Sequence, residues 1–339
     1  MKKLNVLVVG STGYIGVQLV KLLCKHKFIK IKYLCGNSSI GKKIETYDKS
    51  LKKYKLPKII KIKFNYFKEV DVIFTALPNG QSQIIANNLN DRNVLIDLSA
   101  DFRIKKFDIY EKFYKIKHKS KNLLNKSIYA LPELYENEIK KKQIIACPGC
   151  YPTSIILPLY PLLKKNYLKK NQIIIDSKSG YSGAGRGILK KANKIDLFNS
   201  LRAYGLPNHR HNAEIKQELS KISKNINFNF TPHILPIFRG ILSTIYVEKK
   251  EGITAYNISN FLKKFYRKNK FIKINKINKL ISTKDVINTN YCEISICESN
   301  NKDKLIILSA IDNLIKGGAG QAIQSLNIKF GFNLGEGLN

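Results

Sequence analysis

A short pattern near the amino terminus restricts the fold more than any other part of the sequence. Residues 4–9 form a mostly apolar run, which passes through Gly10, Gly13 and Gly16 into a helical pattern at residues 17–24. A buried strand that turns on glycines into a helix presents N–H groups where a pyrophosphate binds. Glycine turns also join strands to helices that bind nothing. The pattern therefore predicts a dinucleotide-binding domain only if strands and helices go on alternating.

The alternation does go on. Residues 28–35, 70–78 and 93–98 are apolar runs that predict buried strands, and the stretch 81–90 predicts a helix between the last two. This order is typical of a doubly wound parallel sheet, whose ligands bind at the carboxyl ends of the strands. We therefore expect an α/β fold.

Arg103 follows the last of these strands, at the end where ligands bind. It is a candidate clamp for an anion, and the alternative is a surface ion pair with Asp101. The next stretch, residues 104–126, is Lys-rich and weakly periodic. It predicts a solvated excursion that carries little chemistry.

The end of the second predicted strand bears on the choice of nicotinamide cofactor. NAD enzymes usually place an acidic residue there, on the ribose 2′-hydroxyl. Residues 36–42 contain neither Asp nor Glu, but they do contain Ser38, Ser39 and Lys42. Hydroxyls, backbone amides and a lysine suit a 2′-phosphate, so NADP is expected rather than NAD. An ordinary polar turn is the alternative.

The composition sets broad limits. A chain of 339 residues predicts two domains. The net charge of +36 comes almost entirely from Lys scattered among Ile, Asn, Tyr and Phe. Codons rich in A and T supply these residues, so we interpret the charge as a result of genome composition and expect no nucleic acid as partner. The positive charge would still attract a small anionic substrate. No apolar run approaches the roughly 18 residues of a membrane helix, so no membrane partner is expected.

The cysteines and the start of the chain bear on the compartment. The six cysteines are irregularly spaced, which predicts free thiols rather than a disulfide framework. No small-residue cleavage site follows the first apolar run, which we interpret as a strand and not as a signal peptide. We therefore expect a cytoplasmic protein.

Cys150 is placed as a reactive cysteine would be. Residues 143–146 predict a buried strand and residues 154–163 a buried helix, with Cys150 between them. Pro152 is favoured in the first turn of a helix, which puts Cys150 just ahead of the helix start. Unpaired N–H groups and the positive end of the helix dipole then face its sulfur. This environment favours a thiolate.

Two further polar segments lie in the second half of the chain. Residues 172–176 predict a strand, and the glycine-dense loop after it carries Arg186. His209, Arg210 and His211 precede a helical run at residues 215–222. A single histidine is usually structural, but two beside an arginine at a helix start predict a functional site. No metal is expected, because no cysteine pair has zinc-finger spacing.

The remaining segments complete the second domain. Residues 228–233, 240–248, 290–297 and 304–309 alternate in the manner of antiparallel strands, which predicts an α+β domain. A glycine-rich turn after Asn313 then leads into a carboxyl-terminal helix.

Several motifs together resemble the family of N-acetyl-γ-glutamyl-phosphate reductases, arginine-biosynthesis enzymes of the aspartate-semialdehyde dehydrogenase-like group. The resemblance covers nearly the whole chain, and its most specific parts are the segment 148–153 and the segment 182–186. The other motifs that carry it are the glycine turn 10–16, residues 97–103, His209 to His211 with Glu214, residues 231–236 with 239–242, and residues 316–322.

The resemblance implies a fold and a domain organisation. A Rossmann domain that binds NADP would comprise residues 1–149 and 312–339, and an inserted α+β domain with a mixed or antiparallel sheet, residues 150–311, would serve catalysis and oligomerisation. A homodimer or homotetramer is expected.

The resemblance also implies residue roles. Cys150 would be the nucleophile, His211 the acid and base, and Glu214 the residue that orients the imidazole. Substrate contacts would come from Arg103, Arg186, His209, Arg210 and Arg239. Cofactor contacts would come from Gly10, Ser11, Thr12, Gly13, Tyr14, Ile15, Gly16, Ser38, Ser39, Lys42, Leu77, Pro78, Ser182, Gly183 and Asn313. The chain departs from the family pattern at Cys147, where Asn is usual, and at Asn79, where His is frequent.

The implied reaction explains why these residue types are needed. A thiolate displaces phosphate from an acyl phosphate, and the resulting thioester accepts hydride from NADPH. A free cysteine has a pKa of about 8.5, and a helix terminus contributes only about 0.3–1 kcal/mol. The dipole alone is therefore insufficient, and His211 is expected to hold the proton.

Other functions fit parts of the sequence. Cys147 and Cys150 form a CxxC between a strand and a helix, as in a thiol-disulfide oxidoreductase, although that function leaves the glycine turn and the histidines unexplained. The same two thiols could instead form a reversible disulfide that switches off catalysis. A reductase of another acyl phosphate, such as aspartyl or carrier-linked aminoadipyl phosphate, would need the same residues. A basic nucleic-acid-binding protein is a further alternative.

Overall fold

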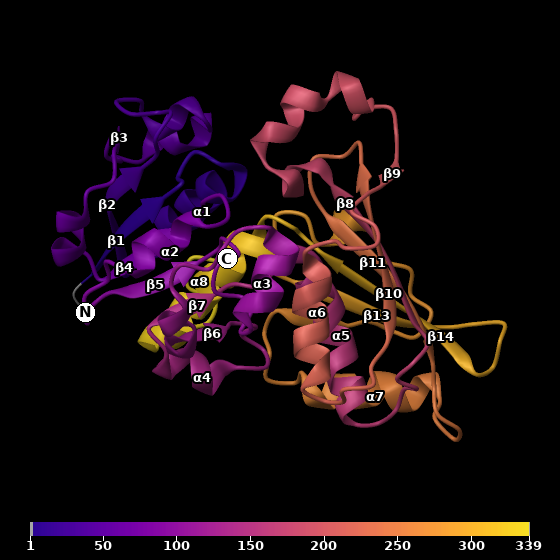
Figure 1. Ribbon diagram of the computed structural model, residues 1–339. Helices are drawn as coiled ribbons and strands as arrows, with labels where there is room; N and C mark the ends of the chain where they lie inside the picture. Colours follow the sequence, from indigo (N-terminus) through magenta and orange to yellow (C-terminus); the bar gives the residue numbers. More distant parts are fainter. Residues whose placement is uncertain (1–2, 339) are drawn as a thin grey trace. The chain divides into compact units, whose positions relative to one another are not determined.

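The computed structural model describes residues 3–338, so residues 1, 2 and 339 of the predicted terminal ranges lie outside it (Figure 1). The chain divides into two compact units. Unit 1 comprises Met1–Pro148 and Gly318–Asn339, and unit 2 comprises Gly149–Gly317. The chain therefore leaves unit 1 immediately before Cys150 and returns to it after Gly317.

Unit 1 is built on a seven-stranded sheet with the strand order β3-β2-β1-β4-β5-β7-β6. Every neighbouring pair is parallel, which confirms the predicted doubly wound sheet. The strands are β1 (Leu4–Val9), β2 (Ile29–Cys35), β3 (Ile59–Ile60), β4 (Val72–Thr75), β5 (Val94–Asp97), β6 (Ser127–Tyr129) and β7 (Ile144–Ala146). The helices are α1 (Tyr14–Lys25), α2 (Gln81–Ala86), α3 (Phe107–Tyr114), α4 (Glu136–Lys141) and α8 (Gly320–Phe330).

Both faces of this sheet are covered because apolar residues occupy both sides of its strands. α1 and α8 contact each other, with α1 against β1 and β2 and α8 against β5. On the other face, Leu7 and Val9 belong to a buried cluster with Ile85 and Ala86 of α2. The order of strands changes direction between β1 and β4, which is where a doubly wound sheet binds its ligand.

The prediction of a solvated excursion at residues 104–126 is right for its Lys residues and wrong for its aromatic core. The segment contains α3, whose Tyr110 and Tyr114 are buried, and it also buries His118. The Lys residues of the segment are exposed, whereas Tyr110, Tyr114 and His118 pack inward. The weak periodicity concealed this because the helix is only eight residues long.

Unit 2 is built on a second seven-stranded sheet, with the order β12-β13-β14-β11-β8-β10-β9. The sheet is mixed: residues 228–233, predicted to be antiparallel, belong to β10, which pairs parallel with β8 and antiparallel with β9. The strands are β8 (Ile173–Gly180), β9 (Arg202–Ala203), β10 (Phe228–Leu235), β11 (Ile241–Glu248), β12 (Ile272–Ile274), β13 (Cys292–Glu298) and β14 (Lys304–Ile311). The helices are α5 (Cys150–Lys164), α6 (His211–Ser220) and α7 (Ala255–Phe265). A π-helix, Ile315–Ala319, spans the boundary between the units at Gly317–Gly318.

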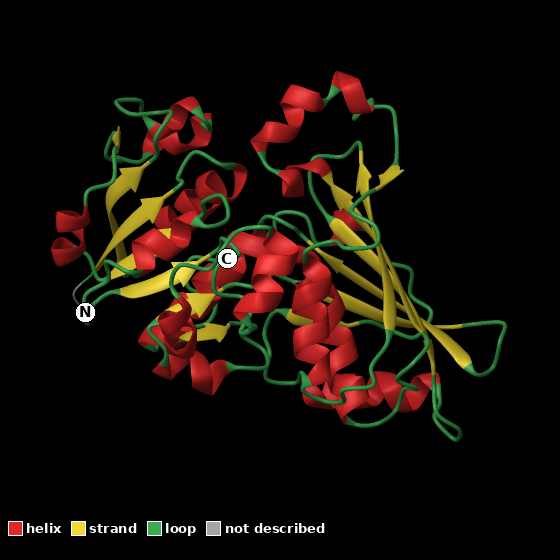
Figure 2. Cartoon of the chain, in the orientation of Figure 1, coloured by secondary structure: helices red, strands yellow, loops and turns green. Residues whose placement is uncertain are grey.

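α5 packs on β11 and β14, α7 packs on β12 and β13, and α6 packs against α5 (Figure 2). α5 is buried along nearly its whole length although it contains Pro158 and Pro161. A proline inside a helix removes the N–H that would bond to the carbonyl four residues earlier. The Tyr266 hydroxyl donates to the Leu157 carbonyl at 2.6 Å and satisfies the group that Pro161 leaves without a helical partner. No helix of residues 3–338 is both long and apolar enough to span a membrane.

Candidate active site

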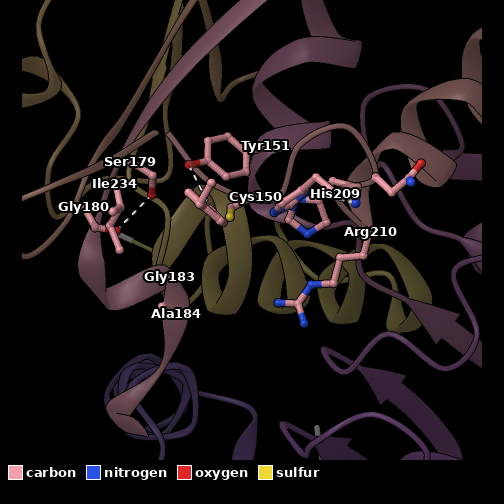
Figure 3. Close-up of a pocket in the computed structure, with 13 residues that line it drawn as sticks. Cys150, Tyr151, Ser179, Gly180, Gly183, Ala184, His209, Arg210 and Ile234 are labelled. Carbon is pink, nitrogen blue, oxygen red and sulfur yellow. Dashed lines mark hydrogen bonds between the residues drawn. The ribbon is translucent and has the colours of Figure 1, made fainter. Parts of the chain in front are cut away.

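A cavity of about 390 Å³ lies in unit 2. Figure 3 shows Cys150 in this cavity, between the end of β8 and the loop that carries His209 and Arg210. The cavity is lined by Cys150, Tyr151, Ser179, Gly180, Gly183, Ala184, Tyr204, Gly205, Asn208, His209, Arg210, His211 and Ile234. The structure thus brings the predicted nucleophile together with both histidines, which lie about sixty residues away in the sequence.

Cys150 is the first residue of α5, not a residue ahead of it as predicted. The helix can start this early because the first four N–H groups of a helix have no helical partner, so Pro152 costs none. Gly149 is the N-cap, and no side-chain hydrogen bond caps the helix start. The first turn contains no acidic residue. The sulfur therefore lies at the positive end of a 15-residue helix without an intervening carboxylate in that turn.

His211 and Glu214 both contact the residue before the nucleophile. His211 Nε2 lies 2.5 Å from the place that a Cβ on Gly149 would occupy, so only glycine leaves room for the imidazole. Glu214 is fully buried, and its Oε2 accepts the Gly149 N–H at 2.9 Å. Its Oε1 is 3.8 Å from His211 Nε2, beyond hydrogen-bond length. Glu214 therefore holds the turn before Cys150 as well as lying beside the imidazole.

His209 has a different environment from His211. Its ring packs edge-on against Tyr151, Tyr204 and Phe230, and its Nδ1 accepts the His211 N–H at 3.2 Å. Burial, and then the neighbouring Arg210 cation, lower the pKa of His209 to about 4. The neutral ring with Nδ1 as acceptor carries its proton on Nε2. His209 is thus a hydrogen-bond donor that stays uncharged at neutral pH.

The predicted substrate arginines are placed differently from one another. Arg210 lines the cavity, whereas Arg186 is exposed and lies outside the lining. Arg239 Nη1 pairs with the buried carboxylate of Asp312 at 3.1 Å and also donates to Asn288 Oδ1. Arg103 belongs to unit 1, where it is buried and donates to the Leu98 carbonyl at 3.0 Å.

A π-helix supports the nucleophile from another side. A Cβ on Gly317 would lie 2.6 Å from the Cβ of Cys150, so the bare glycine packs directly on the nucleophile. The turn is held by Asp312, whose Oδ1 accepts the N–H groups of Leu314 and Ile315. Sequence reasoning missed Asp312 and gave Gly317 no role. The glycine pattern at residues 317–320 was the available indication of a close approach.

Three predicted cofactor residues of unit 2 contact one another or the cavity. Asn313 donates to the Ser182 hydroxyl at 2.9 Å and accepts the Gly240 N–H at 2.7 Å, so its amide joins three segments of the chain. Ser182 and Asn313 are buried, while Gly183 is exposed and lines the cavity.

The other predicted cofactor residues lie in unit 1. The glycine turn joins β1 to α1, with Gly13 as the N-cap, no side-chain cap and no acid in the first turn. Gly10 has a φ of +81° and lies against Ala76, so the fold itself requires glycine there. At Gly13 a Cβ would meet only the Gly10 carbonyl oxygen, at 3.8 Å. Among residues 3–338, therefore, no contact within the chain requires glycine at this position.

The remaining residues of this set differ in exposure. Ser11 is buried and donates to the Cys35 carbonyl, whereas Thr12, Tyr14 and Ile15 are half-buried. Ser38 and Lys42 are exposed, but Ser39 is buried and bonds to the Tyr47 hydroxyl. Leu77 and Pro78 lie in the loop after β4.

Sequence reasoning also missed the tyrosines of the cavity. Tyr151 is buried and donates to the His233 carbonyl at 2.9 Å, and the Tyr204 hydroxyl lies 3.3 Å from its oxygen. Burial raises the pKa of Tyr204 to about 12. Both hydroxyls therefore stay protonated at neutral pH. Within residues 3–338 no group of three His, Cys, Asp or Glu residues could hold a metal ion.

Comparison with known proteins identifies relatives of the whole chain. Two family profiles match, "Semialdehyde dehydrogenase, NAD binding domain" over residues 5–142 and "Semialdehyde dehydrogenase, dimerisation domain" over residues 150–313. The chain is 44% identical over 330 residues to N-acetyl-gamma-glutamyl-phosphate reductase of Ehrlichia ruminantium (strain Gardel), covering 96% of this chain and 94% of the relative.

Solved structures share the fold at low sequence identity. Aspartate semialdehyde dehydrogenase II of Vibrio cholerae, complexed with ASA, aligns with a TM-score of 0.72 at 16% identity, over 97% of this chain and 98% of that one. Aspartate semialdehyde dehydrogenase of Candida albicans, solved with NADP, aligns with a TM-score of 0.68 at 17% identity, over 96% and 98%.

Proposed function

Because the chain belongs to the family of N-acetyl-gamma-glutamyl-phosphate reductases, we propose that it reduces N-acetylglutamyl 5-phosphate to the 5-semialdehyde, with release of phosphate, through a thioester on Cys150. This is a step of arginine biosynthesis. The main observation behind the proposal is that one cavity is lined both by Cys150, at the amino end of α5, and by His211.

The residues of the cavity account for the bond changes. The Cys150 sulfur attacks the acyl carbon, and the bond to the phosphate oxygen breaks, so phosphate leaves. Bound NADPH supplies the hydride that reduces the thioester carbon. The C–S bond of the resulting thiohemiacetal then breaks, which returns the thiolate and releases the aldehyde. His211 takes the thiol proton at the start and holds a proton beside the oxygen that becomes charged.

The surroundings of Cys150 keep these atoms in place. Glu214 fixes the Gly149 N–H, and the imidazole of His211 rests on Gly149 itself. The amino end of α5 contributes positive potential at the sulfur. His209, which stays neutral, and Arg210 offer a neutral and a charged donor for the oxygens of the substrate. Arg210 is the one arginine in the cavity lining, which contains no lysine, so we assign it to the phosphate or carboxylate.

We propose NADP rather than NAD as the cofactor. The amino end of α1 and the uncrowded Gly13 suit a pyrophosphate, while Ser38 and Lys42 are exposed where a 2′-phosphate would need them. The relative structure solved with NADP has the same fold. Fluorescence titration should give tighter binding of NADPH than of NADH, and Lys42→Glu should remove the difference. Equal affinities in the native chain would refute the proposal.

The chain has the dimerisation domain of its family and assembles as an oligomer. We propose a homodimer or homotetramer in which unit 2 forms the interface. The helices cover one face of its sheet, while Ile174 and Tyr246 on the other side are 51% and 41% exposed. All six cysteines are free thiols, which supports a cytoplasmic location.

A thiol-disulfide oxidoreductase is not favoured. Cys147 is 1% exposed at the end of β7, and burial raises the pKa of its thiol well above the ordinary value. A buried neutral thiol exchanges slowly, because the thiolate is the reactive form.

The substrate is tested by the reverse assay. With phosphate and NADP present, N-acetylglutamate semialdehyde should drive NADP reduction, and aspartate semialdehyde should not. Cys150→Ala should abolish the reaction. Activity with aspartate semialdehyde alone would overturn the substrate assignment and leave the thioester chemistry standing.

A further inference from the structure

The motif at residues 97–103 contains a buried carboxylate whose purpose the reaction does not explain. Asp101 is fully buried in unit 1. Its Oδ1 accepts the Gly80 N–H at 2.7 Å and the Tyr110 hydroxyl at 2.6 Å. Its Oδ2 accepts the N–H groups of Ser82 at 2.9 Å and Gln83 at 3.3 Å. Four donors thus converge on one carboxylate.

These bonds hold one end of the loop that follows β4. Gly80, with a φ of +87°, ends this loop and is the N-cap of α2. The other end of the loop is held by the same motif, because the Leu77 N–H donates to the Ser99 hydroxyl at 3.0 Å. Residues 77–80 are therefore fixed at both ends by side chains that follow β5.

The fixed loop lies directly against the glycine turn. A Cβ on Gly10 would clash with the Ala76 carbonyl and lie 3.3 Å from a methyl of Leu77. β1 and β4 are neighbours at the place where the strand order reverses, so their following loops flank the position at which a doubly wound sheet binds a dinucleotide.

Residues 104–126, the segment that was expected to be solvated, also contact Asp101 and the start of α2. Tyr110 comes from α3, and Gln83 Nε2 donates to its hydroxyl at 3.2 Å. His118 Nε2 bonds to the Asp101 carbonyl at 2.8 Å, and the Ser120 hydroxyl donates to the Gln83 carbonyl at 3.2 Å. The excursion is thus tied to Asp101 and to the start of α2.

We propose that Asp101, held by Tyr110, is a positioning residue for the dinucleotide: it fixes the loop 76–80 as one wall of the nucleotide site. The inference rests on the proposed function, because it takes unit 1 to bind NADP. Asp101 acts through the loop and does not itself touch the cofactor. A carboxylate is favoured over an Asn amide, because either orientation of the amide would place its NH₂ against at least one backbone N–H, that of Gly80 or those of Ser82 and Gln83.

The test measures NADPH binding to the purified full-length chain by fluorescence titration, without turnover. Asp101→Asn should weaken the affinity about tenfold, which corresponds to about 1.4 kcal/mol. Tyr110→Phe should weaken it about threefold, because three N–H donors still hold Asp101. If Asp101→Asn does not fold, Tyr110→Phe decides the question.

Asn93→Ala is the matched control. Asn93 is buried beside the amino end of β5, where its amide donates to the carbonyls of Phe67 and Val70. Its loss should lower the melting temperature and leave NADPH affinity within twofold. An equal loss of affinity in Asn93→Ala, or an unchanged affinity in folded Asp101→Asn and Tyr110→Phe, would overturn the inference. If the native chain binds no NADPH, the proposed function fails instead.

Discussion

The turn from β1 into α1 and the turn from β7 into α5 have nearly the same backbone but different surroundings. Each helix has a glycine N-cap, Gly13 with φ −66° and ψ 164° and Gly149 with φ −66° and ψ 157°. Neither has a side-chain cap or an acid in its first turn. At Gly13 the protein leaves the glycine open, whereas at Gly149 it fills the space with His211 and bonds the N–H to Glu214.

The difference shows that one local structure can serve two kinds of chemistry. A helix start that is left open suits a phosphate from outside the protein. A helix start that the protein closes with its own imidazole and carboxylate can hold a reactive side chain at its first position. The surroundings, not the turn, determine which function results.

Removal of the imidazole should have the largest effect. His211→Ala should lower kcat of the reverse assay about 10²–10⁴-fold, because the thiol loses the group that takes its proton. NADPH affinity should stay within twofold, since the glycine turn belongs to the other unit. His233→Ala, which changes a histidine of the same unit outside the cavity lining, is the control. Near-normal turnover in His211→Ala would disprove the pairing of Cys150 with His211.

A methyl group at Gly149, in the turn that His211 and Glu214 close, should have the next largest effect. Gly149→Ala places a Cβ 2.5 Å from His211 Nε2, so the imidazole has to move. We expect kcat to fall roughly 10²-fold, as when a catalytic group is displaced by about 1 Å. Gly187→Ala, whose Cβ would meet nothing within 4 Å, should be neutral. Unchanged kcat in Gly149→Ala would mean that the contact with His211 is not needed.

The same change at Gly13, in the turn that the protein leaves open, should affect the binding of NADPH and not the folding of the chain. A Cβ on Gly13 meets only the Gly10 oxygen at 3.8 Å, and the φ of −66° suits alanine. Gly13→Ala should therefore keep its melting temperature while the Kd for NADPH rises about tenfold, because the methyl occupies the approach of the phosphate. A lowered melting temperature with unchanged Kd would reverse the assignment of the two turns.

The last expected effect is on stability rather than on activity, and it concerns His209, which packs edge-on against His211. Its pKa is lowered from 6.5 to about 4 in the folded chain. As pH falls below 6.5, the unfolded chain binds a proton at His209 that the folded chain does not, so stability decreases until about pH 4. The total loss is on the order of 3 kcal/mol. Urea unfolding at several pH values should show a flatter dependence in His209→Gln, and an identical slope would contradict the lowered pKa.

The sequence predicted the parallel sheet closely because its strands are buried on both faces and are therefore continuously apolar. Residues 4–9 coincide with β1, and residues 28–35 differ from β2 by one residue. Of the site, the prediction included Cys150, His209, Arg210 and His211, because each lies beside a helix start that the pattern revealed.

The sequence could not show which polar residues are used inside the protein. Arg239 was expected to bind substrate, but Asp312, 73 residues away, pairs with it. Tyr110 was placed in a solvated segment because nothing local indicates that Asp101 lies beside it. Such contacts depend on the tertiary fold, so the spacing of residues along the chain does not predict them.

The packing of Gly317 on Cys150 has a consequence for how the chain connects the two units. The chain passes between the units only twice, at Pro148–Gly149 and at Gly317–Gly318. One of these links immediately precedes the nucleophile in the chain, and the glycine of the other packs on its Cβ. Both links between the units therefore lie beside the nucleophile, one along the chain and one through the packing of Gly317 on its Cβ.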